Sequence, residues 1–131
     1  QDDKIMKKRV FFNEFNILMG KTTYLPLVSG LLRAFAETRN KIVQNYQFMP
    51  FLFHMDSPES ILEQYHNPSV AAFSVCMWNE QLNLKVAKEV NKLWPNCLIV
   101  FGGPQVPHNP KNYFIQEWYY NYSKNYSINS I

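Results

Sequence analysis

The stretch VAAFSVCMWNEQLNLKVAKEVNKLWPNCLIVFGGPQVP, residues Val70–Pro107, decides the fold. It opens with an apolar run that ends at Cys76, and such runs are typical of strands covered on both faces in parallel sheets. A helical pattern follows, with apolar residues recurring every three or four positions and lysines mostly on the other side. Pro95 ends that helix, and Cys97–Phe101 forms a second apolar strand before a Gly-Gly-Pro turn. The stretch therefore predicts a parallel strand–helix–strand unit.

Upstream of this unit the sequence predicts two more strands and two more helices. The first strand is expected around Phe15–Met19, and the first helix begins at Pro26, whose missing N–H costs nothing there. The second strand, Phe48–Met55, contains Pro50, which cannot donate to a central ladder, so this strand is expected at the sheet edge. Ser57, followed by a proline and a glutamate, predicts the start of the next helix.

Strands and helices thus alternate along the chain. This predicts an α/β fold with a doubly wound, flavodoxin- or Rossmann-like parallel sheet, strand order 2-1-3-4, and helices on both faces. A fifth strand is not clearly predicted, because the end of the chain is rich in Asn, Tyr and Ser and lacks a clear period. We expect a basic N-terminal extension over residues 1–9, one domain over residues 10–108, and a tail over residues 109–131 that starts as a helix and then becomes disordered.

The composition favours one lightly charged domain. The chain has 131 residues, of which 47% are hydrophobic and only 18% charged, and such a surface often belongs to a domain that packs against another. Much of the net charge of +3 lies in one early cluster, Lys4, Lys7, Lys8 and Arg9. A nucleic-acid module would spread its basic residues along a whole face, so we interpret the cluster as a solvated extension and expect neither nucleic-acid nor membrane binding.

Cysteine usage and the start of the chain predict the compartment. Cys76 and Cys97 both lie inside apolar runs and are expected to be free buried thiols. The first residues are polar, and no apolar run approaches the length of a membrane span. These features predict a soluble protein in a reducing, cytoplasmic setting.

Two loops carry the predicted binding site. In open α/β sheets ligands bind at the carboxyl ends of the strands. The loops Ser74–Asn79 and Gly102–Pro107 follow neighbouring strands and should form one ligand-binding edge. Ser74 offers a hydroxyl group, and the methionine and tryptophan of the same loop offer a flat, polarizable surface. The paired glycines of the other loop permit close approach by a ligand.

Other chemistry is not predicted. Gly20-Lys21-Thr22 looks like the end of a phosphate loop, but the position five residues before Gly20 is Phe15 instead of glycine. The three histidines, His54, His66 and His108, are not spaced for a metal site with another ligand, although the first and last follow strands at the predicted edge. No serine–histidine–acid or paired-carboxylate arrangement is evident, so we predict no catalytic residue and no metal ligand in this chain.

The residues just described resemble a known family. The run Val70–Pro107 is similar to the N-terminal cobalamin (vitamin B12)-binding domain of radical S-adenosylmethionine (SAM) proteins, as is Tyr24-Leu25-Pro26 followed by Gly30-Leu31-Leu32. The resemblance implies that the corrin lies across the carboxyl ends of the strands and that its nucleotide tail inserts between sheet and helices. It assigns cofactor binding to Tyr24, Leu25, Ser74, Met77, Trp78, Asn79, Gly102, Gly103 and Pro104. The serine and the two glycines would line the tail pocket, and Tyr24, Leu25, Met77 and Trp78 would lie nearer the corrin.

Two departures from the family pattern qualify this expectation. The loop Gly20–Pro26 lacks the histidine of an Asp-x-His-x-x-Gly motif, so no axial cobalt ligand is expected from it. The iron–sulfur motif Cys-x-x-x-Cys-x-x-Cys is also absent. The resemblance therefore implies a non-catalytic, truncated module that positions cobalamin for a separate radical SAM catalytic domain in cis, of the methyltransferase type. The parent protein would also use an iron–sulfur cluster and SAM.

Two alternatives remain open at this point. The chain could be a module for flavin or another small molecule on the same fold. A flavin site would favour a first loop rich in Ser and Thr, and Thr22-Thr23 matches that pattern only weakly. It could instead be a truncated fragment that binds nothing alone, with an exposed sheet edge through which a dimer forms.

Overall fold

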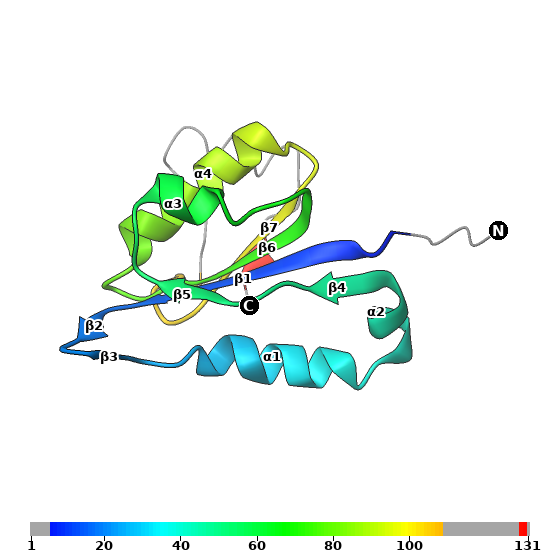
Figure 1. Cartoon of the computed structure of the whole chain (residues 1–131), viewed down its shortest axis with the longest axis horizontal. Coiled ribbons are helices and arrows are strands. Elements are labelled where there is room, and N and C mark those ends of the chain that lie inside the picture. Colours follow the sequence, from blue (N-terminus) through cyan, green and yellow to red (C-terminus); the bar gives the residue numbers. More distant parts are fainter. Residues whose placement is uncertain (1–5, 109–128, 131) are drawn as a thin grey trace.

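A parallel sheet lies between two helical layers in the computed structural model, which describes residues 6–108 and 129–130 (Figure 1). The strands of this sheet are β1 (Lys8–Asn16), β4 (Tyr46–Phe48), β5 (Leu52–His54), β6 (Pro68–Ser74), β7 (Leu98–Gly102) and β8 (Asn129–Ser130). Helices α3 (Pro58–Leu62) and α4 (Glu80–Leu93) cover one face, and α1 (Leu27–Glu37) with the short α2 (Asn40–Asn45) lies on the other. The sheet order is β4-β1-β6-β7-β8, with β5 also pairing with β1, and all of these pairs are parallel.

The predicted fold class and strand order are confirmed. The second predicted strand is interrupted at Pro50 and consists of β4 and β5, which pair in succession with β1 at the sheet edge. β8 adds a two-residue fifth strand beside β7, where the sequence favoured a tail without one. The remainder of the predicted tail, residues 109–128 and 131, lies outside the described residues, as do residues 1–5 of the predicted extension.

The first strand was predicted too late in the chain. β1 runs over Lys8–Asn16 instead of Phe15–Met19. Its three polar residues Asn13, Glu14 and Asn16 indicate an interruption of the apolar run in the sequence, but the first two are buried in the sheet. The expected loop at Gly20 contains an antiparallel hairpin of β2 (Leu18–Met19) and β3 (Thr22–Thr23), with Gly20 at a φ of +63° in its turn. This hairpin geometry differs from a phosphate loop, which leads directly into a helix.

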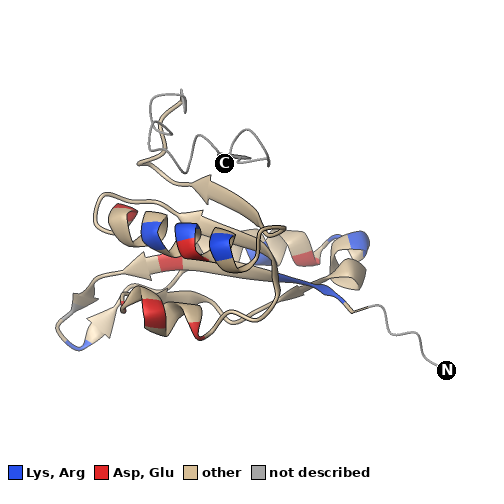
Figure 2. Cartoon of the chain, turned by 90° about the horizontal axis from the view of Figure 1, so that it is seen from above, with Lys and Arg blue, Asp and Glu red and all other residues tan. Residues whose placement is uncertain are grey.

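The hydrophobic core lies between the sheet and the layer of α3 and α4. Alternate residues of each strand point to this side, as the pleat requires. The buried side chains on this side come from the strands and from the residue after β6: Phe11, Phe15, Ala71, Phe73, Val75, Ile99 and Phe101. Val86 and Val90 of α4 and Ile61 of α3 complete the core from above. The lysines of α4 lie on its outer side, away from the sheet, as the sequence predicted (Figure 2).

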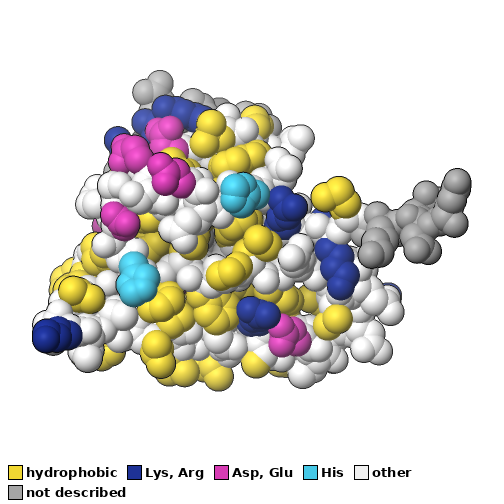
Figure 3. Space-filling view, viewed as in Figure 1, with side chains coloured by type: hydrophobic (Ala, Val, Ile, Leu, Met, Phe, Trp, Pro, Cys, Tyr) yellow, Lys and Arg dark blue, Asp and Glu magenta, His cyan; other side chains and the backbone are white. Residues whose placement is uncertain are grey.

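Helix α1 is confirmed, but its apolar stripe faces outward. Leu27, Leu31 and Phe35 recur at helical spacing and are 68%, 63% and 64% exposed. The residue of α1 that is fully buried is Ser29. Figure 3 shows the resulting hydrophobic surface along α1, at the lower edge of the molecule. Among the described helices, none is long and apolar enough to cross a membrane.

Candidate functional site

The two loops predicted to form one edge do lie together at the carboxyl ends of β6 and β7. The backbone N–H of Val75 donates to the carbonyl of Gly102 over 2.6 Å, and that of Gln105 donates to the carbonyl of Val75 over 3.2 Å. Gly103 has a φ of +108°, and a Cβ there would lie 2.5 Å from the Val75 carbonyl oxygen. The glycine is therefore required for the contact between the two loops, whatever it contributes to a ligand.

Asn79 fixes the shape of the serine loop from inside. Its side chain is 1% exposed, accepts from the Cys76 N–H over 2.7 Å, and donates to the carbonyl oxygens of Phe15 and Ser74 over 2.9 and 3.0 Å. Asn79 directly precedes α4. It occupies the N-cap position, but its side chain makes no cap hydrogen bond and binds the preceding loop instead. Asn83, one turn later, donates to the same Ser74 carbonyl over 3.1 Å.

The predicted corrin-side residues surround the carboxyl end of β1. The indole N–H of Trp78 donates to the Phe15 carbonyl over 3.3 Å, and Asn16 donates to the Tyr24 carbonyl over 3.4 Å. These bonds bring the serine loop and the loop before α1 to the same strand end. The four apolar side chains in question are largely exposed, at 63% for Tyr24, 77% for Leu25, 80% for Met77 and 46% for Trp78.

A cavity of about 140 Å³ lies between α1 and the sheet at this edge. Three of the predicted binding residues, Ser74, Gly102 and Gly103, line it. The other six predicted residues, Tyr24, Leu25, Met77, Trp78, Asn79 and Pro104, are not part of its wall. Apolar cavities of about 150 Å³ accommodate an aromatic ring such as benzene, so this cavity has room for one ring.

Most of the cavity wall was missed by the sequence analysis. The sheet contributes Phe12, Asn13, Ala72, Phe73 and Val100, and α1 contributes Val28, Ser29 and Leu32. The alternation of the strands contains a signal for part of this set, because Ala72 lies two residues before Ser74 and pairs with Val100. The α1 residues could not be found in this way. The apolar pattern of α1 predicts that the stripe with Leu27, Leu31 and Phe35 faces the sheet, but the opposite side of the helix does.

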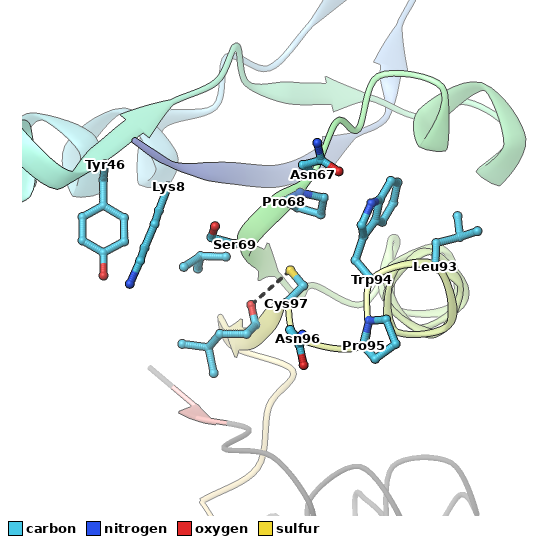
Figure 4. Close-up of a pocket in the computed structure, with 12 residues that line it drawn as sticks. Lys8, Tyr46, Asn67, Pro68, Ser69, Leu93, Trp94, Pro95, Asn96 and Cys97 are labelled. Atoms are coloured by element: carbon cyan, nitrogen blue, oxygen red, sulfur yellow. Dashed lines mark hydrogen bonds between the residues drawn. The ribbon is translucent and has the colours of Figure 1, made fainter. Parts of the chain in front are cut away.

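A larger, open groove of about 500 Å³ lies at the opposite, amino-terminal edge of the sheet (Figure 4). Lys8 and Tyr46 line it on one side, and Trp94, Pro95 and Cys97 line it on the other. The carboxyl ends of the strands are the usual ligand edge of open α/β sheets. The cavity under α1 is therefore the better candidate, although it is the smaller of the two.

Neither cysteine forms a disulfide bond, and Cys97 is buried while Cys76 is half-buried. Burial raises the pKa of the Cys97 thiol to about 12. Burial, and to a smaller extent the nearby Glu14 carboxylate, raises the pKa of Cys76. Within residues 6–108 and 129–130, no three His, Cys, Asp or Glu side chains gather into a group that could hold a metal ion.

Comparison with known proteins gives two curated relatives, while no family model matches the chain. The chain is 37% identical over 107 residues to the cobalamin-dependent radical SAM methyltransferase TokK of Streptomyces tokunonensis, a match that covers 82% of this chain and 15% of that protein. It is 34% identical over 112 residues to 2-(S-pantetheinyl)-carbapenam-3-carboxylate methyltransferase of Streptantibioticus cattleyicolor, covering 86% of this chain and 16% of the relative. The chain thus spans only 15–16% of the length of these relatives.

Proposed function

Because this chain is homologous to a segment of cobalamin-dependent radical SAM methyltransferases, we propose that it is a cobalamin-binding module of a larger enzyme of that kind. The observation that carries this proposal is the cavity under α1 at the carboxyl edge of the sheet, lined by Ser74, Gly102 and Gly103. The family resemblance assigns the same three residues to the tail pocket on sequence grounds alone.

The lining of the cavity suits an aromatic ring, and its volume has room for one ring of the fused base of a nucleotide tail. Phe12, Val28, Leu32 and Val100 supply apolar walls, and Ser74 supplies a hydroxyl group. A cavity with few polar groups binds flat apolar rings well, because little polar surface is left unpaired. Gly102 and Gly103 contribute only backbone to the lining, and Gly103 packs against the Val75 backbone.

The corrin would rest on the apolar edge beside the cavity. Tyr24, Leu25, Met77 and Trp78 expose large apolar surfaces there, which a macrocycle would cover. Pro104 follows the glycine pair at the same edge, and Asn79 holds the serine loop in shape from below. The loop over residues 17–26 contains no histidine, so it would supply no histidine ligand to cobalt. Cobalamin, when bound, would supply the methyl-carrying chemistry, and the protein would position it.

The reaction itself would be carried out by a separate catalytic domain in the same polypeptide, using an iron–sulfur cluster and SAM. The outward apolar stripe of α1, with Leu27, Leu31 and Phe35 more than half exposed, supports contact with another domain.

Titration with hydroxocobalamin tests the proposal directly. The chain should retain the cofactor during gel filtration and shift its absorption spectrum, and binding weaker than tens of micromolar would contradict a self-sufficient site. Cobinamide, which has the corrin but no nucleotide tail, is the matched ligand and should bind more weakly.

A pair of variants tests the location of the tail. Ala72→Leu adds a branched side chain to the wall of the cavity, and we expect it to weaken cobalamin binding by about tenfold or more with little effect on cobinamide. Ala34→Leu makes the same change on the exposed side of α1 and should bind both ligands like the unmodified chain. Unchanged cobalamin affinity in Ala72→Leu would exclude this cavity as the tail pocket.

A further inference from the structure

Helix α1 is fastened to the sheet by one buried carboxylate. Glu14 lies near the carboxyl end of β1, and its side chain points to the α1 face. Its Oε2 accepts from the backbone N–H and the hydroxyl of Ser29, both over 2.8 Å, and its Oε1 accepts from the backbone N–H of Val28 over 3.3 Å. Glu14 is 9% exposed and Ser29 2%, so water competes little for these bonds.

The carboxylate takes the place of a missing cap. The first N–H groups of a helix have no partner within the helix and need one from elsewhere. The residue at the N-cap position of α1 is Pro26, which makes no side-chain cap bond. Glu14 satisfies the N–H groups of the second and third helical residues from the neighbouring strand, and its negative charge suits the positive end of the helix dipole.

Within the described part of the chain, few other contacts hold α1 in position. Its apolar stripe faces away from the sheet, so hydrophobic packing contributes less than in an ordinary amphipathic helix. In the middle of the helix, the Arg33 guanidinium lies over the rings of Phe48 and Phe51, at 5.8 and 5.7 Å from their centroids. At the end near the cavity, the polar bonds from the sheet to α1 come from Glu14.

The residues that Glu14 binds are also part of the cavity wall. Val28, Ser29 and Leu32 form the α1 side of the cavity, and the first two are the partners of the carboxylate. The position of this wall relative to Ser74 therefore depends on Glu14. We propose that Glu14 is a positioning residue for the nucleotide-tail pocket, acting through the first turn of α1, an inference that rests on the proposed cobalamin function.

The test compares two ligands that differ only in the tail. Glu14→Gln keeps the size of the side chain, removes its charge and replaces one acceptor oxygen by a donor. We expect it to lower cobalamin affinity by about tenfold while changing cobinamide affinity by less than about threefold. Ser29→Ala removes only the hydroxyl bond and should give a smaller loss in the same direction. Glu37→Gln is the matched control, since it removes a carboxylate of α1 that is exposed and pairs with Arg33.

The outcomes separate this inference from the function on which it rests. If the unmodified chain binds neither cobalamin nor cobinamide, the proposed function fails and the role of Glu14 fails with it. If cobalamin binds more tightly than cobinamide and Glu14→Gln leaves that ratio unchanged, the function stands and this inference is refuted. An equal loss for both ligands would also refute it, because a general loss of folded protein has no preference for the tail. Far-UV circular dichroism of each variant measures the folded fraction independently.

Discussion

Three glycines offer a test of why the turn after β7 needs glycine. An alanine at Gly103 would have both a positive φ, +108°, and a Cβ only 2.5 Å from the Val75 carbonyl oxygen. At Gly20 an alanine would have a positive φ, +63°, with nothing within 4 Å of its Cβ. At Gly30, within α1, it would have neither problem. The series separates backbone strain from steric overlap.

The expected free energies of unfolding follow from these geometries. Gly20→Ala should lose about 1–2 kcal/mol, the usual cost of the left-handed region for an L-residue. Gly103→Ala should lose about 1–3 kcal/mol for its φ and about as much again for overpacking against backbone that cannot rotate away. Its total is therefore about 2–6 kcal/mol. Gly30→Ala should gain about 0.5–1 kcal/mol, because alanine restricts the unfolded chain and favours the helix.

Urea unfolding, followed by circular dichroism, measures the free energy of unfolding of all three variants. We expect the three to share one m value, the slope of that free energy against urea concentration. In thermal unfolding, each kcal/mol should correspond to a shift of about 4–8 °C for a domain of this size. Gly103→Ala must be the least stable variant and Gly30→Ala the most stable. If Gly103→Ala and Gly20→Ala lose the same free energy of unfolding, the overlap of the Gly103→Ala Cβ with Val75 is relieved at no cost. That result would refute the argument that Gly103 is required for the contact between the two loops.

Two further predictions concern buried polar groups. Asn79→Ala should reduce the free energy of unfolding by about 2–4 kcal/mol, since it leaves buried backbone groups of the serine loop unpaired, whereas Asn96→Ala at an exposed asparagine should change it by less than about 0.5 kcal/mol in the same urea assay. Equal effects would show that the Asn79 network does not hold the loop. Burial raises the pKa of Cys97 from 9.0 to about 12, so the folded chain keeps a proton that the unfolded chain loses. The contribution of the buried Cys97 thiol to the free energy of unfolding is fully present below pH 9 and is lost as the pH rises toward 12. Urea midpoints should therefore fall over that range, less steeply in Cys97→Ala; identical slopes would contradict it. Burial also raises the pKa of Tyr65, so part of the fall should persist in that variant.

Much of the fold could be predicted because local patterns and packing agree. The apolar runs at β6 and β7 are buried on the α4 side, and the stripe of α4 faces them. Ser57 accepts from the Ser60 N–H over 3.2 Å, as a cap should, and α3 begins at the next residue. The strand order followed from these elements, since right-handed crossovers and an edge position for Pro50 leave few arrangements.

The errors occurred where polar residues are buried. The bounds of β1 were wrong because Asn13 and Glu14 read as breaks in the apolar run. The sheet accepts both: Asn13 donates to the Ala72 carbonyl over 2.9 Å and accepts from the Tyr65 hydroxyl over 2.7 Å. Glu14 binds the first turn of α1. All of these partners lie 14 or more positions away in the sequence, so no local pattern contains them.

The binding site was predictable to the extent that glycine and serine mark loop geometry. The pairing of the Ser74 loop with the Gly102 turn followed from adjacent parallel strands alone. The wall from α1 did not, because periodicity shows that a helix has an apolar stripe without showing what the stripe faces. In α1 the stripe is exposed and a serine is buried, which inverts the usual arrangement. A buried serine is stable there because Glu14 accepts its hydroxyl and its N–H.

That inversion links the two proposals through one helix. If a catalytic domain covers the outward stripe of α1, this helix alone separates the domain from the tail pocket. A catalytic domain that contacts Leu31 and Phe35 would then contact α1, the helix whose inner side places Val28 and Ser29 in the cavity wall. Glu14 fixes only the first turn of α1. Movement farther along the helix would therefore change the cavity at Leu32 before it changes the hydrogen bonds between Glu14 and the first turn. If contact with the catalytic domain restrains this movement, tail binding should tighten, and the isolated chain should bind cobalamin more weakly than a longer protein containing the same segment.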